Sequence, residues 1–307
     1  MTKLNHSNYL KDKDFNIDKE YYKLFKFKET NFNTLKKEYP YSLLFHDIDF
    51  KDIIFFDNDL FIKIESRIAE QLEYIFDFRK NIKERIEQVF NYEGYSQGQK
   101  LTPFFTNNFY FRTCFYCNKD FINNFEENTE KLVSTFQLDH FYDKGTYPYL
   151  ALSLYNLIPS CPTCNSSKVK GSENTFQVCL PPNDENFDFE NKVKFKLFLD
   201  KDCVNLHVQD KEDIDIALKE QFTNEYDKYI EIFKLNERYK AHKDIVYEMI
   251  QKAELYPESR LKELQDLTGI PFQQIKKDIF NLSDEIDLSK KPFSKLIKDM
   301  SEELGLV

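Results

Sequence analysis

Two pairs of cysteines near the middle of this 307-residue chain have the spacing of metal-binding turns. Two residues separate the cysteines of each pair, so both sulfur atoms turn toward one point. Four thiolates from two such pairs make the tetrahedral ligand set that Zn²⁺ favours in structural sites. The pairs are Cys114 with Cys117 and Cys161 with Cys164. They predict a structural zinc ion, and the alternative is a set of unliganded buried thiols.

An acidic residue and a histidine stand side by side between the cysteine pairs. They are Asp139 and His140, and Asn156 follows them before the second pair. A neutral histidine can take a proton from water, and an adjacent carboxylate can hold a hard divalent cation against a phosphate. This pattern indicates phosphodiester hydrolysis. The alternatives are a structural histidine bonded to its neighbouring acid and an ordinary turn residue at position 156.

Two polar residues follow the last cysteine closely. Asn165 and Lys168 are three positions apart, so they lie on one face if the segment is helical. Such a helix directs the Asn165 amide oxygen toward a metal and the Lys168 ammonium toward a phosphate. The alternatives are that Asn165 caps a helix and that Lys168 and Lys170 are simply solvated.

The order and spacing of these residues resemble the HNH endonuclease family over about residues 112–171. The resemblance implies a ββα-metal fold, built on a hairpin and a helix and braced by the four-cysteine zinc. It implies that His140 is the general base and that Asn156 fixes the loop bearing it. It also implies that Asp139 and Asn165, the latter at a position that is often His, hold a catalytic Mg²⁺ or Mn²⁺. Lys168 matches the basic residue that commonly follows.

A narrower resemblance involves the residues after this motif. Pro181-Pro182, the run Asn186-Phe-Asp-Phe and the helical Leu235-Asn-Glu-Arg238 make the chain similar to the HNH subunit (PtuB) of Septu-type anti-phage systems. That resemblance implies a DNA endonuclease that acts with an ABC/SMC-like ATPase of the PtuA type. It does not cover the first ~100 residues. Two alternatives are an RNA-cleaving HNH toxin and a zinc-braced adaptor module with lapsed catalysis.

The charge of the chain is unevenly distributed. The net charge is −10, yet residues 110–171 contain 6 basic and 6 acidic residues, whereas residues 172–307 contain 20 basic and 29 acidic residues. A polyanion such as DNA therefore should bind the middle of the chain, and the acidic C-terminal region should bind a partner protein. No apolar run is long enough for a membrane span and the N-terminus lacks a secretory pattern, so we expect a cytoplasmic protein.

Periodicity divides the chain into three segments. They are an N-terminal helical segment (1–103), an HNH nuclease domain (104–180) and a mostly helical, acidic C-terminal region (181–307). The predicted fold class is α+β, mainly helical. Apolar residues at three- and four-residue steps predict one long helix over residues 60–92.

Shorter patterns predict the remaining elements. Strands are expected at residues 53–56 and 192–199, and helices from Ile214 onward with breaks at Pro257 and around Gly269. The remaining cysteines, Cys179 and Cys203, are interpreted as free thiols. The other histidines have no partner pattern and are interpreted as surface or packed residues; they are His6, His46, His207 and His242.

Overall fold

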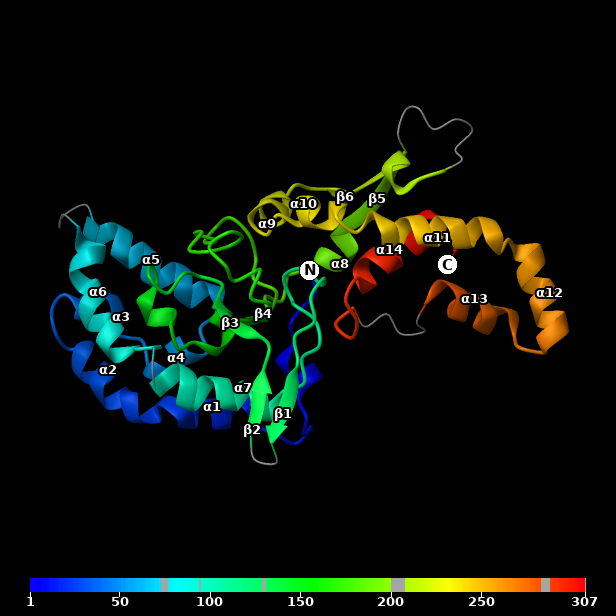
Figure 1. The fold of residues 1–307 in the computed structure, drawn as a ribbon. Helices are drawn as coiled ribbons and strands as arrows, with labels where there is room; N and C mark the ends of the chain where they lie inside the picture. Colours follow the sequence, from blue (N-terminus) through cyan, green and yellow to red (C-terminus); the bar gives the residue numbers. More distant parts are fainter. Residues whose placement is uncertain (73–76, 94, 129–130, 200–207, 283–287, 307) are drawn as a thin grey trace. The chain divides into compact units, whose positions relative to one another are not determined.

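The structure, a computed structural model, describes residues 1–72, 77–93, 95–128, 131–199, 208–282 and 288–306. Roughly half of the chain is helical, and the strands in these ranges form three two-stranded antiparallel sheets (Figure 1). The chain is therefore α+β, as predicted. None of the helices described here is long and apolar enough to cross a lipid bilayer.

The chain divides into two compact units, each assembled from separate stretches of sequence. We call residues 4–111 and 122–185 the histidine unit, and residues 1–3, 112–121 and 186–307 the C-terminal unit. The elements of the histidine unit are η1 (His6–Tyr9), α1 (Ile17–Phe25), η2 (Lys26–Lys28), α2 (Glu29–Leu35), α3 (Tyr41–Phe45), α4 (Phe50–Ile54), α5 (Asn58–Leu72), α6 (Phe78–Val89), η3 (Tyr95–Leu101), α7 (Thr102–Asn108), β1 (Asn124–Asn128), β2 (Lys131–Ser134), β3 (Gln137–His140), η4 (Pro148–Leu150), η5 (Leu154–Asn156) and β4 (Leu157–Ser160).

The apolar stripe that predicts one helix over residues 60–92 is divided between α5 and α6. Residues 73–76 lie outside the described ranges, and Asp77 follows them with a left-handed backbone, φ 55°. A residue with this φ cannot continue a right-handed helix. α6 therefore begins anew at Phe78 and packs against α5. The single-helix prediction is wrong.

The predicted strand at residues 53–56 is also wrong. Ile53 and Ile54 end α4, and a reciprocal cap closes the first turn of that helix. Within this cap, the Asp52 carboxylate accepts a hydrogen bond from the Asp49 amide at 3.0 Å. Both isoleucines are fully buried. Periodicity does not distinguish a short buried helix from a short buried strand, which explains the error.

Aromatic rings fill much of the core of the histidine unit. Phe61 of α5 is fully buried, and its ring centre lies 4.5 Å from that of Tyr142 and 4.5 Å from that of Phe176. The ring centre of Tyr147 lies 5.1 Å from that of Phe61. Residues 142 and 147 belong to the segment that joins β3 to β4. The aromatic core thus fixes this segment against α5.

His6 is buried in the same unit. It lies among the rings of Phe105, Phe109 and Tyr155. Its Nε2 atom is buried and has no hydrogen-bond partner within the described ranges. Burial lowers the pKa of His6 from 6.5 to about 4. Between these two pH values, the unfolded chain binds a proton that the folded chain excludes.

The burial of His6 predicts that acid destabilises the fold. We expect the stability that the neutral ring contributes to be complete above pH 6.5 and to decrease by about 3 kcal/mol as the pH falls to 4. Urea unfolding across this range measures the effect. His6→Leu should reduce the pH dependence of the free energy of unfolding by the share of one histidine, since the buried His140 contributes in the same range, and the exposed control His46→Leu should leave it unchanged. An unchanged slope in His6→Leu would contradict the prediction.

The C-terminal unit is built on one antiparallel hairpin and a set of helices. Its elements are α8 (Phe189–Lys192), β5 (Val193–Leu199), η7 (Lys211–Asp213), β6 (Ile214–Glu220), α9 (Asp227–Ile232), α10 (Leu235–Lys240), α11 (Lys243–Leu255), α12 (Glu258–Thr268), α13 (Phe272–Phe280) and α14 (Ser294–Glu303). β5 confirms the strand predicted at residues 192–199, and the breaks at Pro257 and Gly269 are confirmed.

The prediction of helices from Ile214 onward is wrong at its start. Residues 214–220 form β6, which pairs with β5. Ile214, Ile216 and Leu218 are buried at every second position, which is the period of a half-buried strand. This two-residue period is the sequence signal that the helical assignment overlooked.

A buried aspartate of α14, paired with a lysine of the same helix, joins α14 to β5. Lys295 Nζ lies 2.7 Å from the Asp299 carboxylate, and neither side chain is exposed. Asp299 also accepts a hydrogen bond from the Phe195 amide at 2.8 Å. Burial lowers the pKa of Lys295 to about 8, although the carboxylate opposes this shift. The last helix is thus attached to the sheet through charge as well as apolar packing.

Candidate active site and metal centre

The β3–β4 hairpin carries the histidine at the end of its first strand. β3 and β4 are antiparallel, with His140 opposite Leu157. The segment between them is closed by Asn156, which is fully buried. Its Oδ1 accepts a hydrogen bond from the Tyr142 amide at 2.8 Å. Its Nδ2 donates to the carbonyl oxygens of Tyr142 at 3.0 Å and Leu150 at 3.2 Å. One side chain thus ties both ends of the connecting segment together.

A buried carboxylate of α5 holds the same segment from another side. Glu65 accepts a hydrogen bond from the Tyr149 hydroxyl at 2.6 Å and forms an ion pair with Arg79 of α6. Arg79 also donates to the Thr146 carbonyl at 3.3 Å. The N-terminal helices therefore help to build this site. Sequence reasoning missed these residues, and the only signal for them was a glutamate next to the apolar stripe of α5.

His140 is oriented by a backbone carbonyl. Its Nε2 lies 3.0 Å from the oxygen of Ala151. A carbonyl oxygen only accepts hydrogen bonds, so Nε2 carries the hydrogen and Nδ1 of the neutral ring keeps a lone pair. Burial lowers the pKa of His140 to about 4, and the charges of Lys144 and Lys170 act in the same direction. The ring is therefore neutral at pH 7 and can accept a proton at Nδ1.

Tyr92 covers His140 from the end of α6. The two ring centres are 4.3 Å apart at an interplanar angle of 77°, and His140 is only 8% exposed. Lys144 lies 5.0 Å from the centre of the Tyr92 ring and forms a 3.0 Å ion pair with Glu93. A cavity of about 640 Å³ borders Tyr92 and Ala151. Its lining contains one lysine, Lys144, and four acidic residues, which disfavour the binding of a phosphate there. The acidic residues are Glu84, Glu87, Glu93 and Asp143.

The contact with Tyr92 predicts that this ring limits access to the histidine. In Tyr92→Ala, we expect diethyl pyrocarbonate, which acylates neutral imidazole, to modify His140 several-fold faster than in the wild type. Mass spectrometry of the digested protein measures the rate at each histidine. The exposed Tyr39→Ala serves as the matched control and should leave the rate unchanged. If His140 were modified at the same rate in the wild type, Tyr92→Ala and Tyr39→Ala, Tyr92 would not limit access to His140.

Asp139 forms a buried ion pair with Lys170. Lys170 Nζ lies 3.2 Å from Asp139 Oδ2, and the two side chains are 1% and 4% exposed. The same ammonium donates a hydrogen bond to the His140 carbonyl at 2.7 Å. This burial contradicts both interpretations of Lys170 from the sequence, a contact with phosphate and a simply solvated side chain.

The helix expected after the last cysteine is not present in this part of the structure. Residues 162–172 form a series of turns, so Asn165 and Lys168 do not share a helix face. Asn165 donates a hydrogen bond to Gln137 Oε1 at 2.9 Å, and Lys168 is exposed. Gln137 begins β3, whereas His140 ends it. The described residues thus contain the β3–β4 hairpin, but the helix that the predicted ββα unit needs after it is not found among residues 162–172.

The residues predicted to hold Mg²⁺ or Mn²⁺ do not fit such an ion in this arrangement. Hard cations take several oxygen ligands and keep bound water. The Asp139 carboxylate instead faces an ammonium in a site closed to water. The amide of Asn165 is engaged at the other end of β3. Among the residues with described positions, the one group of three or more His, Cys, Asp or Glu side chains arranged to share an ion is the cysteine cluster.

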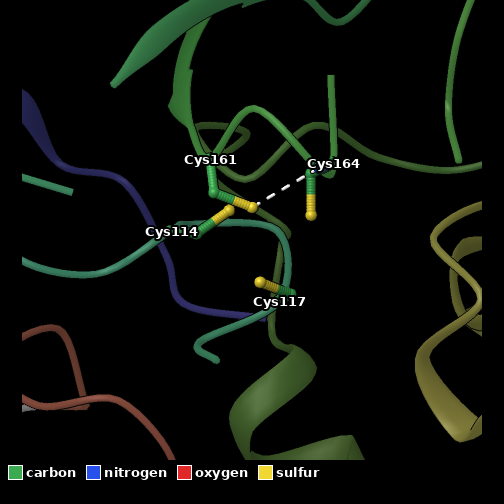
Figure 2. Close-up of side chains that lie close together, drawn as sticks. All are labelled: Cys114, Cys117, Cys161 and Cys164. Atoms are coloured by element: carbon green, nitrogen blue, oxygen red, sulfur yellow. Dashed lines mark hydrogen bonds between the residues drawn. The ribbon is translucent and has the colours of Figure 1, made fainter. Parts of the chain in front are cut away.

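The four paired cysteines come together, as their spacing predicts. Their sulfur atoms lie within 4.8 Å of one another, and all four residues are buried. Figure 2 shows the side chains converging on a common space between them. Four buried thiolates at this separation have the chemistry and geometry of a closed structural zinc site.

Backbone amides also point at two of these sulfur atoms. The Cys164 amide donates to Cys161 Sγ at 3.4 Å, drawn as the dashed line in Figure 2, and the Lys119 amide donates to Cys117 Sγ at 3.5 Å. Each turn therefore directs a backbone N–H at one of its own sulfur atoms. Hydrogen bonds to a charged group favour its charged form.

The turn of the first cysteine pair is held by residues far along the chain within the C-terminal unit. Tyr239 of α10 donates a hydrogen bond to the Cys117 carbonyl at 2.7 Å. The next residue, Asn118, is fully buried, and its side chain accepts from the Lys295 amide at 3.0 Å. Its carbonyl accepts from the Phe293 amide at 2.7 Å. Helices α10 and α14 thus shape this metal-binding turn.

The remaining cysteines and histidines lie outside the cluster or outside the described ranges. Cys179 is buried, and burial raises the pKa of its thiol to about 12, which makes it unreactive at neutral pH. His46 is exposed, and His242 Nε2 lies 3.3 Å from Lys119 Nζ. Cys203 and His207 fall in residues 200–207, which the structure does not describe.

The hydrogen bonds of Asn156 predict a large loss of stability in Asn156→Ala. The substitution removes three hydrogen bonds and leaves buried backbone groups of the connecting segment unpaired, at a cost of about 3 kcal/mol. Urea unfolding followed by circular dichroism measures the change. Asn31→Ala, at an exposed helix position, should change stability by less than about 0.5 kcal/mol. A loss below 1 kcal/mol in Asn156→Ala would contradict the role of this side chain.

Comparison with protein-family models, with curated proteins and with solved structures finds no match for this chain. The likeness to HNH nucleases therefore depends on the residues already described. Any function has to be argued from the geometry of the histidine unit and the cysteine cluster.

Proposed function

We propose that this chain is an HNH-type endonuclease that hydrolyses phosphodiester bonds of DNA. The observation that carries the proposal is the arrangement at the end of β3. There a neutral His140 is held by the Ala151 carbonyl, in a segment that Asn156 closes. A hairpin that presents an oriented histidine, in a chain that also has a four-cysteine cluster, agrees with the family resemblance of the sequence.

In the proposed reaction, His140 acts as the general base. Nδ1 takes a proton from a water molecule, and the oxygen of that water forms a bond to phosphorus. The bond from phosphorus to the 3′ oxygen breaks, and this oxygen takes a proton from solvent. The products carry a 5′ phosphate and a 3′ hydroxyl. The exposed Lys168 provides a positive charge for a backbone phosphate.

The biological role proposed is that of effector in a cytoplasmic anti-phage system with an ATPase partner. Two features of the sequence support it: the similarity to Septu-type HNH subunits and the net charge of −9 over residues 172–307, from 20 basic and 29 acidic residues. An acidic surface favours a protein partner over DNA. A neighbouring gene for an ATPase would support this role, whereas a neighbouring methyltransferase gene would indicate restriction.

Digestion of two substrates side by side tests the activity. Purified chain is incubated with supercoiled plasmid and with tRNA, and each fraction across the size-exclusion peak is assayed. A DNA endonuclease is supported if the plasmid-nicking activity coelutes with the protein and DNA ligase can reseal the nicks. Cleavage of tRNA alone would identify the RNA-cleaving alternative, and no cleavage of either substrate would contradict nuclease activity.

A zinc-braced adaptor with lapsed catalysis is the second candidate. Three observations favour it: Tyr92 covers His140, Lys170 neutralises Asp139, and the neighbouring cavity is mostly acidic. An adaptor requires the cysteine cluster and the folded units but no free histidine. If neither nucleic acid is cleaved while the protein contains stoichiometric zinc and binds the partner ATPase, this candidate is supported instead.

A further inference from the structure

The turn after the second cysteine pair carries a residue that reaches the end of β3. Lys170 contacts that strand at two points, the Asp139 carboxylate at 3.2 Å and the His140 carbonyl at 2.7 Å. Asp139 and His140 are the two residues that the proposed activity places at its centre. Lys170 therefore connects the metal-binding turn to the catalytic histidine within one unit.

The turn itself fixes the position of Lys170. Its amide donates a hydrogen bond to the Cys164 carbonyl at 3.3 Å, and the Gly171 amide donates to the Ser166 carbonyl at 2.9 Å. Gly171 has φ 54°, and a Cβ added there would lie 3.3 Å from the Ser167 backbone. A glycine is thus needed for the chain to reverse at this point. The path from Cys164 to Lys170 is short and constrained.

The pair of Lys170 and Asp139 is closed to water. Side chains that are 1% and 4% exposed leave no room for a hydrated cation unless the ammonium moves away. Removing either partner would leave the other charge buried without its counter-ion, which is far more costly than the pair itself. The Asp139 carboxylate is therefore already neutralised by the Lys170 ammonium.

We propose that Lys170 is a positioning residue for the reaction proposed above, and that its ammonium takes the place beside Asp139 that the HNH resemblance gives to a divalent cation. Lys170 holds the end of β3 so that the ring of His140 meets the Ala151 carbonyl. Because it is buried, it acts through the strand and does not touch DNA. The positioning role rests on the proposed function, whereas the pairing with Asp139 does not.

A double-mutant cycle tests the pairing. In Lys170→Met and in Asp139→Asn, one charge is left buried, so the unfolding equilibrium constant in urea should rise roughly 100-fold or more in each. The double variant should recover most of this loss, because no unpaired charge remains. Additive losses in the double variant would overturn the pairing.

Binding of Mn²⁺ distinguishes the ion pair from a metal site at Asp139. Electron paramagnetic resonance of zinc-loaded protein measures free and bound Mn²⁺ without any nuclease assay. We expect wild type and Asp139→Asn to bind Mn²⁺ equally. Binding by the wild type that is lost in a folded Asp139→Asn would show that Asp139 is a metal ligand and would overturn the proposal.

Kinetics test the positioning role at a temperature where circular dichroism shows the variants folded. Lys170→Met should lower the kcat of plasmid nicking at least tenfold and leave KM within about twofold, because a buried residue makes no uniform binding contact. The exposed Lys168→Met is the matched control and should change KM more than kcat. An unchanged kcat in folded Lys170→Met would refute positioning. If the wild type does not nick, the proposed function fails together with this role, while the cycle and the Mn²⁺ measurement still decide the pairing.

Discussion

Replacing Cys164 by Ser should remove the bound zinc and unfold the chain around both cysteine turns. The sulfur is one of four that lie within 4.8 Å of one another in a buried cluster. In such sites, metal binding and folding are one equilibrium, with apparent binding free energies of about 10–16 kcal/mol for small zinc domains. Zinc content by mass spectrometry and the midpoint of thermal unfolding, each with and without chelator, measure the effect.

Cys179→Ser is the matched control for this prediction. Cys179 is also buried and also loses only its sulfur, but it lies outside the cluster. We expect this variant to keep one zinc per chain and to lose little stability. A Cys164→Ser protein that retained the zinc and the unfolding midpoint of the wild type would disprove the metal centre. A wild-type chain that binds no zinc would do the same.

Replacing His140 by Ala should lower the kcat of plasmid nicking by ~10²–10⁴-fold, the usual contribution of a general base. KM should change little, because the buried ring offers DNA almost no surface. The substitution also removes the contacts with Tyr92 and Ala151, so the assay is made where circular dichroism shows a folded variant. Initial rates over a range of plasmid concentrations separate kcat from KM.

His46→Ala controls for the general effect of losing an imidazole. His46 is exposed and lies outside the site, so its variant should nick at the rate of the wild type. Nicking by His140→Ala at that same rate would mean that another group, or a contaminant, cleaves the DNA. The assignment of the general base would then have to be abandoned.

Local patterns were sufficient for the features formed within a few residues. The spacing of Cys161 and Cys164 brings both sulfurs to one side of a turn, and the coming together of all four paired cysteines is confirmed. The strand predicted at residues 192–199 is confirmed as β5. Within each cysteine pair and within the strand, the covalent chain fixes the geometry, whereas the meeting of the two pairs was predicted from the preference of zinc for four thiolates.

Features that depend on distant contacts could not be predicted in this way. Asp139 and Lys170 are 31 positions apart, and nothing in the sequence near either residue says that they pair. Tyr92 follows α6 and meets the ring of His140, which ends β3 far along the chain. The break at Asp77 depends on a left-handed backbone at a residue with no turn-forming glycine beside it. These arrangements are set by tertiary packing, which overrides local preference.

The residues that hold the first cysteine turn are made much later during protein synthesis than the turn itself. Asn118 is held by the backbone of Lys295, 177 positions later, and Cys117 by Tyr239, 122 positions later. A ribosome makes the cysteines long before it makes these supports. We infer that the nascent thiols stay unprotected until α14 is complete, so that zinc loading is a late step of maturation.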